Sequence, residues 1–151
     1  MQTPLRAPRV LFICTGNICR SPTAHALLVH KARAAGFAVE VDSAAIESHT
    51  RGWPADERAV DEAQRRGVAM PPRGARPVGT RDFDHYDLLV GMTRHHCETL
   101  RGRSPGHAAK VRMLLDADVP DPWYGSEADF SRAFEMIERG VGELLKSLSK
   151  P

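Results

Sequence analysis

Cysteine is scarce in this sequence, and the shortage excludes one large class of small proteins. Only three of the 151 residues are cysteines, namely Cys14, Cys19 and Cys97. Such an odd, low number does not suit the disulfide framework that stabilises small secreted domains. Residues 1–8 contain two prolines but not the apolar segment of a signal peptide. We therefore expect a cytoplasmic protein whose thiols are reduced.

Other absences narrow the function further. No apolar run approaches the roughly 20 residues that cross a membrane, so we expect no membrane association. The 21 Lys and Arg residues nearly balance the 19 Asp and Glu residues, and a net charge of +2 is too small to predict a nucleic-acid partner. The sequence has no glycine-rich nucleotide fingerprint and no zinc-type pairing of ligands. We expect no cofactor and no metal, and the oligomeric state is not indicated.

Short apolar runs alternate with helix-like segments along the chain. We predict strands at 10–13, 37–42, 87–92 and 110–114. We predict helices from Ser21 to near Gly36, over 56–66, over 93–101 with Gly102 closing the helix, and from Ser126 or Asp129 to Leu148. Ser21 should cap the first helix and Pro22 should be its first residue. This order predicts one α/β domain over 1–151, a four-stranded parallel twisted sheet with helices on both faces.

A polar loop follows the first predicted strand, where ligands bind in such sheets. Its backbone N–H groups and the following helix N-terminus favour an anion, and Gly16 permits a tight turn. Arg20 lies six positions after Cys14, so its planar guanidinium can return to hold two phosphate oxygens. The spacing therefore predicts a phosphate-binding loop. Its other residues are Thr15, Gly16, Asn17, Ile18, Cys19 and Ser21.

Cys14 occupies the base of this predicted loop. A helix N-terminus and a nearby cation both lower the pKa of a thiol, and a hydroxyl of Ser21 or Thr15 can donate to the thiolate. The alternative is an inert buried cysteine at the end of a strand. The combination with Arg20 favours a nucleophile directed at phosphorus.

The segment 14–24, Cys-Thr-Gly-Asn-Ile-Cys-Arg-Ser-Pro-Thr-Ala, resembles the signature of the low-molecular-weight protein tyrosine phosphatases. The segment 121–125, Asp-Pro-Trp-Tyr-Gly, is similar to a second loop of that family, and 41–44 resembles the end of its second strand. Length and element order agree as well, so the resemblance covers almost the whole chain. It implies hydrolysis of phosphotyrosine in proteins and peptides.

The resemblance also implies roles for individual residues. Cys14 would be the nucleophile, Arg20 the phosphate clamp, and Asp121 the general acid and then the base. Only the resemblance selects Asp121, because Asp116 and Asp118 lie nearby. The remaining implied roles are Asn17 shaping the loop, Ser43 supporting Asn17, Ser21 bonding the thiolate, Trp123 and Tyr124 walling a deep slot, and Cys19 trapping oxidised Cys14 as a disulfide.

The sequence departs from the family at His25, at Arg73 and in the segment after Ser43, where Ala-Ala-Ile-Glu-Ser-His replaces the usual small polar run. His25 stands where the family usually has Glu, and Arg73 takes the approximate place of a histidine that braces the loop asparagine. His95, His96 and Cys97 are interpreted as structural, because adjacent helix residues do not share a face.

Three other functions compete with the phosphatase. A thiol-dependent arsenate reductase needs two further cysteines, and only Cys97 lies downstream. A phosphocarrier needs neither Arg20 nor Asp121. A phosphotyrosine-binding module without turnover does not need Cys14, Arg20 and Asp121 together.

Overall fold

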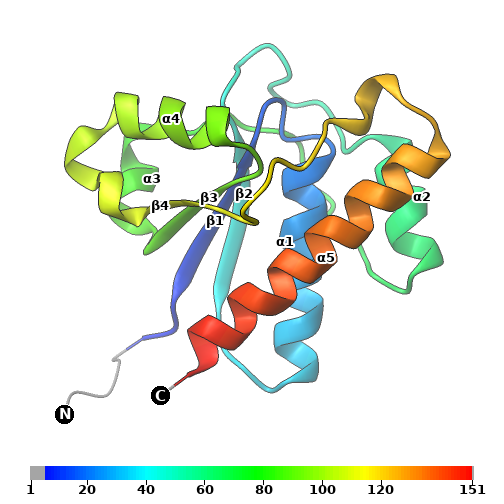
Figure 1. Ribbon diagram of the computed structural model, residues 1–151, viewed down its shortest axis with the longest axis horizontal. Helices are drawn as coiled ribbons and strands as arrows, with labels where there is room; N and C mark the ends of the chain where they lie inside the picture. Colours follow the sequence, from blue (N-terminus) through cyan, green and yellow to red (C-terminus); the bar gives the residue numbers. More distant parts are fainter. Residues whose placement is uncertain (1–5, 151) are drawn as a thin grey trace.

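The apolar run at 10–13 forms the centre of a parallel sheet in the computed structural model of the chain, which describes residues 6–150 (Figure 1). Residues 1–5, part of the segment expected to lack a signal peptide, lie outside the described residues. The strands are β1 (Arg9–Cys14), β2 (Glu40–Ala45), β3 (Leu88–Gly91) and β4 (Val111–Met113). They are all parallel and follow the order β2-β1-β3-β4, which confirms the predicted sheet.

Helices cover both faces of this sheet, as predicted (Figure 1). They are α1 (Arg20–Ala34), α2 (Glu57–Arg65), α3 (Thr80–His85), α4 (Arg94–Arg103) and α5 (Glu127–Ser149), with short 3-10 helices η1 (Pro105–Lys110) and η2 (Pro122–Tyr124). Side chains alternate across β1, so Val10 and Phe12 pack in one core cluster with α1 and α5. Leu11 and Ile13 pack in the opposite cluster, with α3 and α4.

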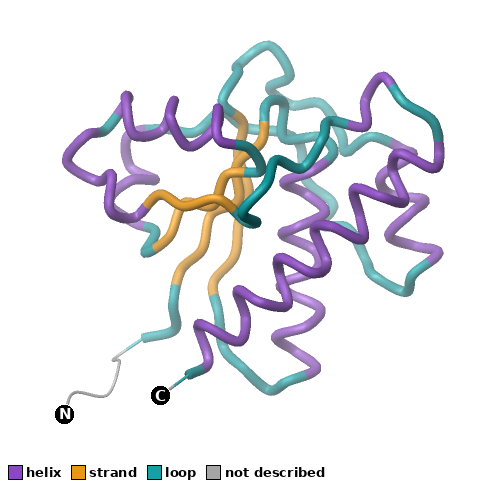
Figure 2. Tube along the Cα trace, viewed as in Figure 1, coloured by secondary structure: helices purple, strands orange, loops and turns teal. Residues whose placement is uncertain are grey.

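The sheet order creates a switch point beside β1. Its two neighbours are β2 and β3, so the chain leaves β1 toward one edge and later returns to build the other edge. The loops that follow the strands gather at the carboxyl end of the sheet (Figure 2). In parallel sheets ligands bind at this crevice, and β1 therefore delivers its following loop to that position.

Two predicted boundaries near β1 are wrong. Helix α1 begins at Arg20 with Cys19 as N-cap, not at Ser21 and Pro22, because the Ser21 hydroxyl bonds Cys14 and Asn17 instead of capping the helix. The second strand occupies 40–45 rather than 37–42. Phe37 donates its backbone N–H to the carbonyl of Ala32, so it still belongs to the helix end, and the strand starts later.

Further along, the predicted elements are present with small shifts. Thr93 caps α4 and Ser126 precedes α5, as expected, but α4 continues through Gly102 to Arg103. The sequence did not indicate α3 or the two 3-10 helices, which are too short to show a periodic pattern. Among residues 6–150, no helix is long and apolar enough to cross a membrane.

Candidate active site

Cys14 is the last residue of β1 and lies at the floor of a pocket at the carboxyl end of the sheet. The residue is only 2% exposed, and its Sγ lies 3.0 Å from Oγ of Ser21 in the first turn of α1. The loop 15–19 joins the two elements, so strand end and helix start meet around the thiol.

Asn17 links the loop to the segment that carries Arg76. Its Oδ1 accepts the backbone N–H of Arg76 at 3.2 Å, which requires Nδ2 to point the other way. Nδ2 then donates to Oγ of Ser21 at 2.8 Å. Ser21 accepts from Asn17, so its own proton is available for a thiolate at Cys14. Asn17 has a φ of 57°, a left-handed conformation that asparagine tolerates better than most residues.

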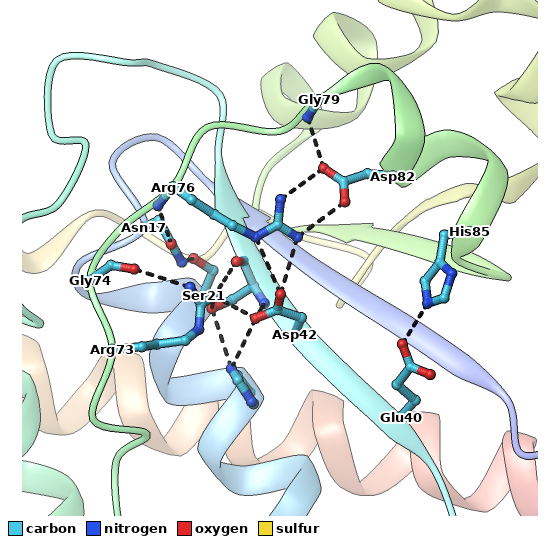
Figure 3. A network of polar contacts seen from close by, with 12 residues as sticks. Asn17, Ser21, Glu40, Asp42, Arg73, Gly74, Arg76, Gly79, Asp82 and His85 are labelled. Atoms are coloured by element: carbon cyan, nitrogen blue, oxygen red, sulfur yellow. Dashed lines mark hydrogen bonds and ion pairs between the residues drawn. The ribbon is translucent and has the colours of Figure 1, made fainter.

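Ion pairs hold the Arg76 segment in place (Figure 3). The guanidinium of Arg76 lies 3.1 Å from Asp42 on β2 and 2.9 Å from Asp82 on α3. Asp82 also accepts the backbone N–H of Gly79 at 2.8 Å. Because the Arg76 backbone holds Asn17, these ion pairs connect the sheet edge to the loop around Cys14.

Ser43 and Arg73 have partners other than those the resemblance implied. The structure gives Ser43 no hydrogen bond to Asn17. Its Oγ instead accepts from Arg73 Nη2 at 2.9 Å and lies 3.4 Å from Nδ1 of His25. Arg73 also pairs with Asp42 at 2.6 Å and donates to the carbonyl of Ser43, so it braces β2 rather than the loop asparagine.

His25 fills the space behind the loop in a buried position on α1. The pKa of His25 is lowered to about 4, mainly by burial, while Asp42 opposes the change and the Arg73 guanidinium adds to it. The family's usual carboxylate is thus replaced by an imidazole that is neutral at neutral pH.

Arg20 reaches across the pocket from the first residue of α1. The residue is 5% exposed, and Nη1 donates to the carbonyl of Val119 at 2.9 Å. Nη2 donates to Oγ1 of Thr15 at 3.3 Å and lies 3.5 Å from Oδ2 of Asp121. The guanidinium is therefore fixed between the Cys14 loop and the loop before α5.

Asp121 is the member of the local acidic group that reaches the pocket. Its side chain is 43% exposed, and Oδ1 accepts the backbone N–H of Trp123 at 3.1 Å. Asp118 instead accepts the backbone N–H of Arg94 at the start of α4. Tertiary contacts thus separate acidic residues that sequence spacing could not distinguish.

The pocket has a volume of about 280 Å³ and aromatic walls. Trp123 and Tyr124 line it, but Tyr124 is 92% exposed and therefore stands at the rim rather than along a deep slot. The loop after β2 also lines the pocket, through His49, Thr50 and Trp53, which the sequence analysis did not identify. The one signal in the sequence that could have indicated this part of the pocket is Trp53, a tryptophan in a polar segment.

All three cysteines are buried and free of disulfides. Burial raises the pKa of Cys19, so its thiol is protonated, and its disulfide with Cys14 stays a prediction. Cys97 packs in the core cluster on the α3–α4 face, whereas Cys14 packs in the cluster on the α1–α5 face. The sheet therefore separates Cys97 from Cys14.

His96 was interpreted as structural, and the structure places it beside the pocket loop. Its Nε2 lies 3.0 Å from Oγ1 of Thr15, although 81 residues separate the two in sequence. No local pattern in the sequence indicates this contact. The neighbouring His95 is exposed.

Comparisons with known proteins agree with this geometry. A family model described as low molecular weight phosphotyrosine protein phosphatase matches residues 9–151. The low molecular weight protein-tyrosine phosphatase A of Mycobacterium bovis is 40% identical over 152 residues, which cover 93% of this chain and 90% of that protein. A protein tyrosine phosphatase structure from Entamoeba histolytica matches with a TM-score of 0.90 and 30% identity, over 94% of this chain and 97% of that one.

A third similar protein has the same fold but is named as an arginine phosphatase. A structure of the YwlE arginine phosphatase matches with a TM-score of 0.88 and 28% identity, over 94% of this chain and 96% of that one. The family match spans nearly all of the chain, and the curated relative exceeds 30% identity over most of both sequences. The chain therefore belongs to the low molecular weight phosphotyrosine protein phosphatase family and is a protein-tyrosine phosphatase.

Proposed function

We propose that the protein hydrolyses phosphotyrosine in proteins, and small aryl phosphates, through a phosphocysteine on Cys14. The observation that carries the proposal is the arrangement around one pocket. Sγ of Cys14 lies at its floor beside a hydroxyl donor, while Arg20 and Asp121 meet at its wall 3.5 Å apart.

In the first step the Cys14 thiolate attacks phosphorus, and the bond between phosphorus and the phenolic oxygen breaks. The Asp121 carboxyl group donates its proton to that oxygen, so tyrosine leaves as a neutral phenol. Arg20 binds two of the phosphoryl oxygens and stabilises the charge that develops on them. Ser21 stabilises the thiolate by donating its proton to Sγ, because a thiolate carries no proton and can only accept.

In the second step water attacks the phosphorus of the phosphocysteine. The Asp121 carboxylate takes a proton from this water, the bond between phosphorus and sulfur breaks, and inorganic phosphate leaves. Cys14 returns to the thiolate, and Asp121 returns to its protonated form. Two steps thus replace one difficult displacement, with no net change in the enzyme.

The shape of the pocket favours an aryl phosphate. Cys14 is almost fully buried, so the phosphate must reach the floor on a long side chain. Trp53 and Trp123 flank the opening with large, partly exposed rings that suit a phenyl group. We expect the shorter phosphoserine side chain to bring its phosphate less well to the buried Cys14.

Two further observations concern the phosphocysteine route and the alternative of an arsenate reductase. In YwlE a cysteine-to-serine variant carries a phosphorylated active-site serine, which supports covalent transfer at the equivalent site here. An arsenate reductase relay would need Cys97, which packs on the other face of the sheet from Cys14. The redox role of Cys19, a single domain over 1–151 and a cytoplasmic location stay predictions.

The first experiment measures phosphate release from a phosphotyrosine peptide by the protein and by its Cys14→Ser variant, with reductant and without added metal. Phosphoserine and phosphoarginine versions of the same peptide serve as controls. We expect the unaltered protein to hydrolyse the phosphotyrosine peptide and Cys14→Ser to leave it intact. Faster phosphate release from the phosphoarginine peptide would show that phosphotyrosine is not the substrate class. Turnover by Cys14→Ser would overturn the phosphocysteine route.

A further inference from the structure

His96 lies in the first turn of α4 and is 2% exposed, although the proposed reaction gives it no part. Its Nδ1 accepts the backbone N–H of Thr93 at 3.2 Å. A neutral imidazole that accepts at Nδ1 carries its proton on Nε2. The helix cap therefore determines which nitrogen of His96 is a donor.

The donor nitrogen points at Thr15, the residue that follows Cys14. Nε2 of His96 lies 3.0 Å from Oγ1 of Thr15, and Nη2 of Arg20 donates to the same oxygen at 3.3 Å. A hydroxyl oxygen accepts at two lone pairs, and both are now occupied. Among the described residues, the Thr15 hydroxyl has no acceptor for its own proton, and it lines the pocket.

We propose that His96 is a positioning residue for the phosphatase reaction: it orients Thr15 so that the hydroxyl supports Arg20 and donates its proton to a phosphoryl oxygen. This inference rests on the proposed function and deepens it. Phosphate would thus meet one more donor than the loop and Arg20 provide. The two residues come from the loop after β1 and the helix after β3, which lie on either side of the switch point.

The arrangement requires a neutral His96, and its surroundings provide one. The pKa of His96 is lowered to about 4, mainly by burial and in part by repulsion from Arg20 and His95. Asp118 acts in the opposite direction. The acceptor at Nδ1, and with it the contact to the Thr93 N–H that orients the ring, is therefore present throughout mildly acidic and neutral pH.

Two substitutions separate the cap from the contact with Thr15. His96→Asn places an acceptor near the Nδ1 position but is too short to reach Thr15. His96→Gln extends a donor to the Nε2 position but leaves the Thr93 N–H without its acceptor. His95→Gln, on the exposed neighbour, is the matched control. Each variant is tested for kcat/KM on p-nitrophenyl phosphate, for the dissociation constant of inorganic phosphate, and for thermal stability.

If His96 positions Thr15, the two variants should rank in opposite orders for activity and for thermal stability. We expect His96→Asn to lose about tenfold in kcat/KM and in phosphate affinity, the effect of one hydrogen bond at a charged site, while its melting temperature changes little. We expect His96→Gln to retain most activity but melt at a lower temperature. Equal losses in both variants, losses that follow the melting temperature, or no loss in either would overturn the inference.

A double-mutant cycle with Thr15→Val completes the test. In the Thr15→Val background, His96→Asn and His96→Gln should give the same kcat/KM and the same phosphate affinity. A difference as large as in the unaltered protein would show that His96 acts by another route, against the inference. Phosphate affinity is independent of turnover, so failure of the proposed phosphatase reaction would be recognised separately by the absence of phosphotyrosine hydrolysis in the unaltered protein.

Discussion

Nη2 of Arg20 lies 3.5 Å from Oδ2 of Asp121, so the proposed phosphate clamp and the proposed acid touch although they are 101 positions apart in sequence. The same guanidinium donates to the carbonyl of Val119, two residues before Asp121. Arg20 thus holds the loop that carries the carboxyl group. Binding of phosphate and placement of the acid are coupled through one side chain.

Replacing Asp121 should slow leaving-group departure. We expect Asp121→Asn to lower kcat about 100-fold or more on a phosphotyrosine peptide, because the amide neither donates a carboxyl proton nor activates water. The loss should be smaller on p-nitrophenyl phosphate, whose leaving group needs less protonation. Steady-state kinetics on both substrates measure the difference, with Asp118→Asn as control. Equal activity of Asp121→Asn and the unaltered protein on the peptide would contradict the assigned role.

Asn17 should serve both the backbone and the nucleophile. Asn17→Gly removes the bond to Ser21 but tolerates a φ of 57°, whereas Asn17→Ala also brings a left-handed penalty of about 1 kcal/mol. We expect both variants to lose activity to a similar degree, and the alanine variant alone to lose the additional stability. Urea unfolding and kcat measure the two effects. A fully active glycine variant would show that the Ser21 contact is dispensable.

Two buried histidines should make stability depend on pH. The pKa values of His25 and His96 are lowered to about 4, mainly by burial, from a usual 6.5. Between these values the unfolded chain binds more protons than the folded one, so the free energy of unfolding rises with pH. We expect up to about 3 kcal/mol per histidine to be lost as pH falls from 6.5 to 4, with no further loss from these groups below 4.

Denaturant titrations from pH 5 to 7 test this slope. Carboxyl groups with lowered pKa values, such as Asp87 beside Arg6 at about 2, lose their stabilising effect only at lower pH. His25→Gln should reduce the slope, whereas substitution of the exposed His95 should leave it unchanged. A slope that persists unchanged in His25→Gln would refute the assignment for that residue.

Trp53 should contribute to substrate binding without supporting the fold. It is 45% exposed and lines the pocket wall. We expect Trp53→Ala to raise KM for aryl phosphates about fivefold, with kcat nearly constant and the melting temperature unchanged, because the ring offers stacking area alone. Trp53→Phe should restore most of the affinity. A large fall in kcat would indicate instead that Trp53 orders the Cys14 loop.

Much of the fold was predictable because its signals are local. The alternation of apolar runs and helix-like segments predicted the parallel sheet, and the run at 10–13 forms part of its most buried strand. The start of α1 was not predictable, since Ser21 and Pro22 match a common helix start. The pocket uses the Ser21 hydroxyl for Cys14, and the helix begins two residues earlier, with Cys19 as N-cap and Arg20 as its first residue.

The active site likewise has a part that local sequence predicts and a part that it does not. Cys14, Thr15 and Arg20 lie within one turn-forming segment, so their shared position could be inferred from spacing. The Arg73 contacts could not, because the resemblance placed Arg73 near Asn17, whereas the folded chain gives that position to the backbone of Arg76. His96 was likewise hidden, since a helix residue 81 positions away carries no sequence signal for Thr15.

The sequence by itself determined the order of the four strands and the four longer helices, the phosphate-binding loop and the family, because these depend on residues close together along the chain. Only the tertiary structure decided which acidic residue meets Arg20, which loop lines the pocket together with Trp123, and which nitrogen donor orients Thr15. Those contacts join the ends of different parallel strands. Their partners are brought together by the packing of the whole sheet, and no local preference encodes that packing.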